Sequence, residues 1–189
     1  MADRRRLSCV SRKTWAAGIP ASVVALLLVG SLTGGQSTSR LAFSAAEAGE
    51  LPFKTAPAFS LLDVEGKRRA LADFLKATPI LLEFMSPDCP HCLEMAPILT
   101  RLHPVYGDRV QFLTVAFDRN TSRIRRFAAL QKHGWPYLVG NQEVINVYRL
   151  EGVPTFCFVA PDGRLIQYAV GSMPEQELRQ HLDALLKAR

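Results

Sequence analysis

Strand-like and helix-like stretches alternate from about residue 57 to the C-terminus, and this alternation constrains the fold more than any other feature. Three short apolar runs are typical of buried central strands: Ile80–Met85, Val110–Phe117 and Thr155–Val159. Three longer stretches repeat apolar residues at helical spacing: Cys89–Tyr106, Ser122–Lys132 and, after a capping-box start at Ser172, the segment to Leu186. Such alternation predicts an α/β domain with a partly parallel sheet. At the start of this alternation, the turn at residues 64–67 separates Ala58–Leu62 from Arg68–Ala70 and predicts that these two segments form a β-hairpin.

The composition allows one packed domain and excludes extensive disorder. Of the 189 residues, 48% are hydrophobic and 21% are charged. The net charge is +6, but residues 1–48 contain six basic and two acidic side chains and so carry most of it. The high isoelectric point therefore gives no reason to predict nucleic-acid binding.

The N-terminal segment has the pattern of an export signal. Between Lys13 and Arg40 lie 26 uncharged residues whose apolar centre runs from Ile19 to Leu32. A basic start followed by an apolar run is typical of a secretory signal or an uncleaved anchor, and the positive-inside rule places the rest of the chain outside the cytoplasm. We predict a signal peptide or signal anchor at residues 1–40, with retention as a membrane anchor slightly favoured. We further predict a flexible tether at 41–55 and the folded domain at 56–189.

The strongest candidate site is Cys89-Pro90-His91-Cys92, between a buried strand and the start of a helix. Two cysteines three residues apart at a helix N-terminus can close a small disulfide ring. Unpaired backbone N–H groups and the helix dipole favour a thiolate on the first of them. We predict Cys89 as the exposed nucleophile and Cys92 as the resolving thiol. An imidazolium at His91 would stabilise the Cys89 thiolate, whereas Asp88 would oppose it.

Two distant residues fit the same chemistry. Glu83 lies in the middle of a buried strand, where a carboxylate is costly without a role. Burial would raise its pKa and let it accept a proton from Cys92. Pro154 precedes the third central strand, and a cis peptide bond there would present backbone groups to an extended partner chain. The other residues expected to contact that chain are Pro90, Val153 and Thr155.

The same residues allow other interpretations. The cysteine pair could be a structural disulfide or half of a metal site, but a metal centre needs about four ligands and no second Cys/His cluster is present. We therefore predict no metal and no cofactor beyond the Cys89–Cys92 disulfide itself. Cys157 is interpreted as a small core residue, with a third redox thiol as the lesser possibility. Three isolated histidines are predicted to face solvent: His103, His133 and His181.

Taken together, these motifs resemble the thioredoxin superfamily. The matching features are Glu83 six residues before the first cysteine, the Cys-x-x-Cys pair, Pro97 five residues after Cys92, and Val153-Pro154-Thr155 before a strand. Within that superfamily the chain is similar to the TlpA/ResA branch of membrane-tethered bacterial oxidoreductases. Two sequence segments carry this second resemblance: Ala56-Pro57-Ala58-Phe59-Ser60-Leu61 and Val159-Ala160-Pro161-Asp162-Gly163-Arg164. The resemblance implies a three-layer α/β/α fold with a central mixed sheet and an N-terminal β-hairpin extension.

The resemblance also implies a function. It predicts a monomeric thiol–disulfide oxidoreductase in the bacterial periplasm or on the outer face of the cytoplasmic membrane. Its clients would be exported proteins with cysteine pairs, such as apocytochromes c or copper-site proteins, and a membrane thiol donor would supply electrons. The Pro-His dipeptide resembles the DsbA oxidase instead, although DsbA has a large helical insertion that this chain lacks. A disulfide-installing oxidase therefore remains an alternative to the favoured reductase, and a copper-binding chaperone module is an alternative of another class.

Overall fold

The computed structural model describes residues 8–9, 51–76 and 78–188. Apart from Ser8 and Cys9, the predicted leader lies outside these residues, as does the predicted tether up to residue 50. No helix within the described ranges combines the length and the hydrophobicity that crossing a bilayer requires.

The core of the molecule is a seven-stranded mixed sheet. In spatial order the strands are β3 (Arg68–Ala70), β2 (Ser60–Asp63), β6 (Tyr137–Val139), β5 (Gln111–Ala116), β4 (Ile80–Met85), β8 (Thr155–Val159) and β9 (Leu165–Val170). The central strand β4 is buried at all six positions, so it is covered on both faces. Strands β4, β5 and β6 run parallel to one another, whereas β8 is antiparallel to β4. The mixed sheet and the β2–β3 hairpin confirm the predicted fold class.

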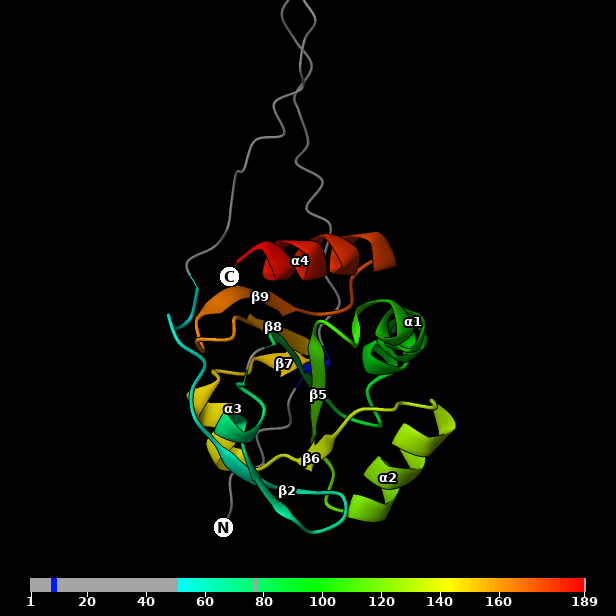
Figure 1. The fold of residues 1–189 in the computed structure, drawn as a ribbon. Coiled ribbons are helices and arrows are strands. Elements are labelled where there is room, and N and C mark those ends of the chain that lie inside the picture. Colours follow the sequence, from blue (N-terminus) through cyan, green and yellow to red (C-terminus); the bar gives the residue numbers. More distant parts are fainter. Residues whose placement is uncertain (1–7, 10–50, 77, 189) are drawn as a thin grey trace, which may run out of the picture. The chain divides into compact units, whose positions relative to one another are not determined.

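Helices cover both faces of this sheet. Figure 1 shows α1 and α2 on one side and α3 on the other, while α4 packs against α1 and β8. The helices are η1 (Leu71–Asp73), α1 (Pro90–Tyr106), α2 (Thr121–Leu130), α3 (Gln142–Val147) and α4 (Glu175–Lys187). The side chains of Asn120 and Asn141 cap α2 and α3 by accepting backbone N–H groups. The capping box predicted at Ser172 is wrong, because α4 begins after Pro174 without a side-chain cap.

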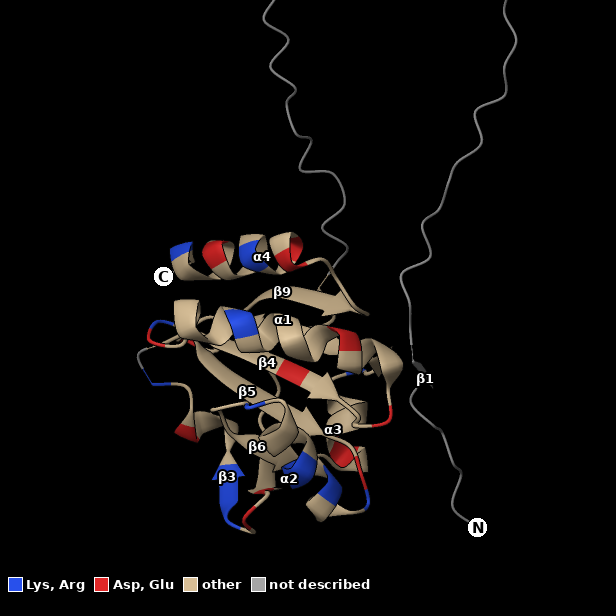
Figure 2. Ribbon diagram, turned by 90° about the vertical axis from the view of Figure 1, so that its right-hand side faces the viewer, with Lys and Arg blue, Asp and Glu red and all other residues tan. Residues whose placement is uncertain are grey.

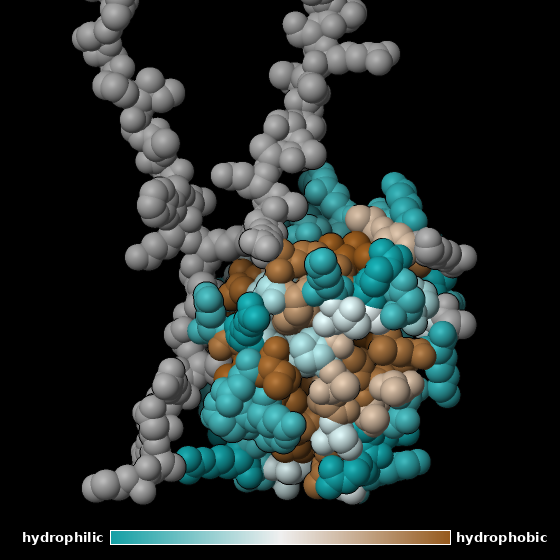
Figure 3. Space-filling view, turned by 90° about the vertical axis from the view of Figure 1, so that its left-hand side faces the viewer, coloured by the Kyte–Doolittle hydropathy of each residue, from teal (hydrophilic) through white to brown (hydrophobic). Residues whose placement is uncertain are grey.

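The chain is packed from near residue 51 onward. Phe53 makes edge-on ring contacts with Tyr148 and Tyr168, at centroid distances of 5.4 and 6.0 Å. Thr55 forms a β-bridge with Arg164. Seen from the α3 side in Figure 3, apolar atoms are interrupted by hydrophilic ones rather than gathered into one uniform patch.

Several predictions of exposure are wrong. Leu93, one of the apolar residues whose helical spacing predicts a buried position in Cys89–Tyr106, is 47% exposed, since it lies on the outer side of the first turn of α1. His133 was expected to face solvent, but its ring stacks on the buried Trp135 at 4.0 Å between centroids. His103 packs edge-on against Phe112. These rings complete the core beside β5, which an isolated histidine in the sequence does not reveal.

A second, two-stranded pairing lies beside the main sheet. Strand β7 (Gly152–Val153) pairs in parallel with β1 (Ser8–Cys9), and the register sets Cys9 opposite Val153. The backbone edge of β7 thus accepts an extended chain directly before Pro154.

Candidate active site at the start of the first long helix

The cysteine pair lies where β4 passes into α1. Cys89 is the N-cap residue of α1 and Pro90 occupies the first turn, where a missing N–H costs nothing. The backbone N–H of Cys92 donates to the carbonyl of Cys89 at 3.0 Å. Both cysteines are present as thiols. The prediction of a helix that starts at this motif is confirmed.

The loop before β8 comes directly against the first cysteine. The Val153–Pro154 peptide bond is cis, as predicted. The Cys89 thiol donates to the carbonyl oxygen of Val153 at 3.3 Å. Because this loop covers it, Cys89 is only 5% exposed, and its prediction as an exposed group is wrong for this conformation. Thr155 is fully buried and its hydroxyl donates to Gly152 at 2.7 Å, so a partner could reach only its backbone.

Cys92 lies beneath Cys89 and is fully buried. Desolvation is the main cause that raises the pKa of its thiol far above the ordinary value, and the neighbouring Cys89 and Glu83 raise it further. The backbone of Ser86 opposes this by hydrogen bonding. A thiol in this environment needs a proton acceptor close by before it can attack a disulfide.

Glu83 is a candidate for that acceptor. Its side chain is 3% exposed, and burial raises the pKa of its carboxyl to about 7, against a counteracting hydrogen bond from Thr114. The Thr114 hydroxyl donates to Oε2 of Glu83 at 2.9 Å. The indole Nε1 of Trp135 in turn donates to Thr114 Oγ1, also at 2.9 Å. The predicted rise in the Glu83 pKa is therefore confirmed in direction and cause.

Sequence reasoning missed the partners of Glu83. Thr114 stands inside the apolar run of β5, and one polar residue in such a run was a usable signal. Trp135 gave no signal in the sequence, because its hydrogen bond to Thr114 depends on how β6 pairs with β5.

Charged residues around the motif are paired. His91 Nδ1 lies 3.0 Å from Glu94 Oε2, which lowers the pKa of Glu94. Asp88 forms an ion pair with Arg123 of α2, and Arg123 also holds Asp118 at 3.1 Å. The unfavourable charge predicted at Asp88 is thus compensated by a basic side chain from another element. Figure 2 shows charged residues on the helices and turns, on β3 and within β4, while β5 and β9 carry none.

Cys157 lies apart from this arrangement. It is fully buried on β8, and its Cα registers with Leu82 of β4 on one side and Tyr168 of β9 on the other. Burial raises the pKa of its thiol well above the ordinary value, as expected of a core residue. Within the described part of the chain, no group of three or more His, Cys, Asp or Glu side chains is placed to hold a metal ion.

Comparison with known proteins gives a consistent result. A family model described as a thioredoxin-like domain matches residues 75–186. The thiol-disulfide oxidoreductase ResA of Geobacillus thermodenitrificans is 27% identical over 133 residues, which cover 69% of this chain and 76% of that protein. The thioredoxin-like protein YneN of Bacillus subtilis is 28% identical over 174 residues, covering 90% and 98% of the two chains.

Solved structures have the same fold. A thiol:disulfide interchange protein of the thioredoxin family from Chlorobium tepidum superposes with a TM-score of 0.63 at 20% identity, over 70% of this chain and 96% of that one. A secreted disulfide oxidoreductase of Mycobacterium tuberculosis, described as homologous to DsbE, gives a TM-score of 0.59 at 22% identity, over 67% and 95%.

Proposed function

The chain belongs to the thioredoxin-like family and is a thiol–disulfide oxidoreductase; from this premise we propose that Cys89 and Cys92 exchange disulfides with exported client proteins outside the cytoplasm. The observation that carries the proposal is the position of Cys89. It begins a helix, its sulfur lies 3.3 Å from the Val153 carbonyl beside a cis-proline, and a second thiol lies beneath it.

The reaction proceeds in two exchanges. The Cys89 thiolate attacks one sulfur of a client disulfide, forms a mixed disulfide and releases the other client sulfur as a thiolate. Cys92 then gives its proton to the Glu83 carboxylate and attacks the Cys89 sulfur, which releases the second client thiolate. Two electrons pass to the client, and the Cys89–Cys92 disulfide is the oxidised product. The protein needs no cofactor for these steps.

Client recognition is assigned to the backbone beside the sulfurs. Strand β1 belongs to the predicted leader, so in the exported protein an extended client segment would take its place along β7. The exposed Pro90 and the peptide groups of Val153 and Thr155 would flank such a segment. His91 would favour the Cys89 thiolate during the first attack.

The direction of electron flow is proposed from the similarity to ResA. We place the protein on the reductase side, with exported cysteine-pair proteins as clients, among them apocytochromes c or copper-site proteins, and with a membrane thiol donor that regenerates the dithiol. The basic and apolar N-terminal segment supports export and membrane attachment. The Pro90-His91 dipeptide favours the alternative, an oxidase. A measured reduction potential of about −270 mV would support the reductase, and one of about −120 mV would support the oxidase.

Cysteine variants test the proposed exchange. Cys89→Ser should abolish reduction of a protein disulfide, because no thiolate then starts the reaction. Cys92→Ser should accumulate mixed disulfides that reductant releases, visible as adducts on a non-reducing gel or by mass spectrometry. Cys157→Ser is the matched control and should keep wild-type turnover. Wild-type turnover in Cys89→Ser, or equal loss in the Cys157 variant, would contradict the proposal.

A further inference from the structure

We propose that Trp135 and Thr114 are positioning residues that hold the Glu83 carboxylate ready to take the proton of Cys92. This inference rests on the proposed role of Glu83 and deepens it. Their side-chain hydrogen bonds lead to Glu83 rather than to the reacting sulfurs. They act through hydrogen bonds on the group that does the proton transfer.

The donor chemistry of the three side chains fixes the direction of both hydrogen bonds. An indole N–H can only donate, so Trp135 must give its proton to the oxygen of Thr114, at 2.9 Å. The threonine hydroxyl has a single proton, and that proton then points to Oε2 of Glu83, also at 2.9 Å. The indole therefore sets the hydroxyl rotor of Thr114 and, through it, the carboxylate.

The sheet holds this chain of contacts in register. Glu83 of β4 pairs with Thr114 of β5, and Thr114 pairs with Tyr137 of β6. The side chains of Glu83, Thr114 and Tyr137 therefore lie in one row on the same face of the sheet. The backbone N–H of Thr114 donates to the carbonyl of Pro136 at 3.1 Å, which ties the Trp135 segment to the same row. The threonine is 1% exposed and the indole 7%. Water cannot easily replace either donor there.

The Thr114 hydrogen bond opposes the effect of burial. Desolvation raises the pKa of Glu83, and the hydroxyl lowers it by stabilising the ionised form, with about 7 as the result. The titratable groups that face Glu83 are Cys92 of α1 and Tyr137 of β6, whose pKa values are both raised. Both are neutral at pH 7, so Thr114 is a main stabiliser of the Glu83 charge.

The Thr114 hydrogen bond makes the two carboxylate oxygens unequal. Since Oε2 accepts the Thr114 hydroxyl proton, Oε1 is the oxygen that we expect to receive the proton from Cys92. The Cys92 S–H bond breaks, the Oε1–H bond forms, and the sulfur electron pair attacks Cys89. Thr114 keeps its own proton throughout.

The experiment separates the two thiol steps with a small aromatic disulfide, 5,5′-dithiobis(2-nitrobenzoate). The full chain carries Cys9→Ser in every sample, including the one taken as wild type, because the Cys9 thiol would also release thionitrobenzoate. Release of the first thionitrobenzoate reports attack by Cys89, and release of the second reports attack by Cys92. The pH profile of the second step is measured for wild type, Thr114→Val, Thr114→Ser and Trp135→Phe. In wild type its rate should rise with pH through a midpoint near 7, the Glu83 pKa.

Thr114→Val should move that midpoint upward by about one unit, because the buried carboxylate loses its donor. Trp135→Phe should move it in the same direction by less, since the aromatic ring remains and only the N–H is lost. Thr114→Ser should restore the wild-type profile. The first step should change by less than about twofold in all variants. A 13C NMR titration of the Glu83 carboxyl should follow the same order.

The outcomes distinguish the inference from the function on which it rests. If wild type releases no second thionitrobenzoate, the proposed exchange itself fails. If wild type has its midpoint near 7 and both Thr114→Val and Trp135→Phe keep that midpoint, the positioning role is overturned while the exchange stands. If Thr114→Val does not fold, Trp135→Phe decides by the same shift. A serine variant that behaves like valine would also overturn the inference.

Discussion

At the scale of single residues, Glu83 couples protonation to stability. Its pKa is about 7 in the folded chain, against 4.5 for an ordinary glutamate, so the folded state binds the extra proton between these pH values. Stability therefore falls as pH rises through this window, because the folded protein must then hold a buried charge. The favourable protonated state is lost at the pH where the proposed reaction needs the carboxylate.

Glu83→Gln removes this penalty. Relative to wild type, the variant's free energy of unfolding should increase by about 2.5 kcal/mol between pH 5 and pH 8, and constant packing differences cancel in this comparison. Urea unfolding of the dithiol forms at the two pH values measures it. Glu143→Gln is the matched control, since Glu143 is exposed on α3. A difference that does not change with pH would show that Glu83 is charged at pH 5 as well.

Residue-scale prediction from sequence succeeded where a residue type contradicts its surroundings. A glutamate in an apolar strand, two cysteines at a helix start and an X-Pro before a strand each stand out in one dimension. The pairing of Asp88 with Arg123 does not, because it joins the loop before α1 to the first turn of α2, and their approach depends on β4 and β5 lying side by side. The cover of Cys89 by Val153 was missed for the same reason.

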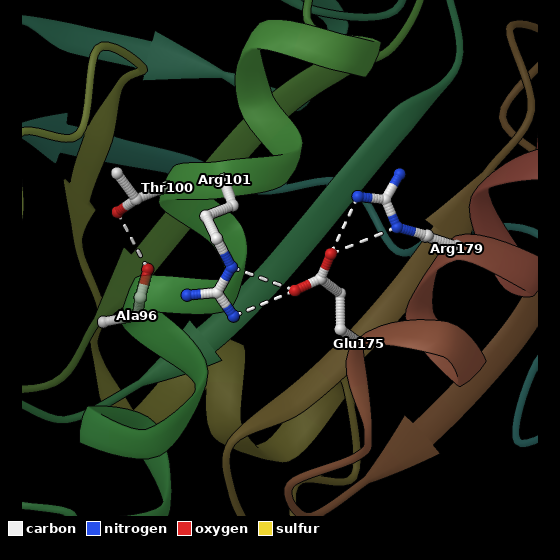
Figure 4. Close-up of polar contacts among 5 residues, drawn as sticks. All are labelled: Ala96, Thr100, Arg101, Glu175 and Arg179. Carbon is white, nitrogen blue, oxygen red and sulfur yellow. Dashed lines mark hydrogen bonds and ion pairs between the residues drawn. The ribbon is translucent and has the colours of Figure 1, made fainter.

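At the scale of elements, an ion-pair cluster joins α1 to α4. Figure 4 shows Glu175 of α4 between Arg101 of α1 and Arg179 of its own helix. The Glu175 carboxylate accepts from Arg101 at 2.9 and 3.0 Å and from Arg179 at 2.7 and 3.1 Å. Hydrogen bonds from Arg179 and then Arg101 lower the pKa of Glu175. The cluster ties the helix that carries the cysteines to the C-terminal helix.

Glu175→Gln should lower Tm at pH 7 by no more than a few degrees, because exposed ion pairs contribute little. Since the folded pKa of Glu175 is lowered, its contribution should be present at neutral pH and disappear as pH falls below that pKa. The decrease in Tm caused by Glu175→Gln should also become smaller in about 1 M salt, where charges are screened. Calorimetric scans over pH and salt measure both effects, and a loss independent of salt would indicate a packing defect instead.

Element boundaries followed the sequence closely in the centre of the sheet and less well outside it. The apolar run at Ile80–Met85 became β4 without change, because every residue in it is buried. The start of α4 was misread, since Ser172 has the right residue type but the chain turns into the helix only after Pro174. Capping depends on backbone angles that the residue type does not determine.

At the scale of the whole molecule, the packed unit includes residues before the predicted domain start. Phe53 contacts two tyrosines, and the carbonyl of Lys54 accepts the N–H of Leu165 at 2.9 Å. The free energy of unfolding of a fragment of residues 56–189 should therefore be about 1–3 kcal/mol lower than that of a fragment of residues 50–189.

Urea unfolding of the two fragments tests where the domain starts. Phe53→Ala in the longer fragment is the matched variant and should account for much of the loss. Equal stability of the two fragments would mean that the packed unit begins at residue 56.

Glu83 also limits how far the thermal stability of this protein can be raised without a loss of activity. The carboxylate proposed to accept the Cys92 proton is a group whose charge the folded interior disfavours at neutral pH. A laboratory selection for heat resistance alone would favour neutral replacements at this position, and each should slow the proposed second thiol step. Thermal stability and the rate of disulfide exchange therefore place opposite demands on the side chain of Glu83.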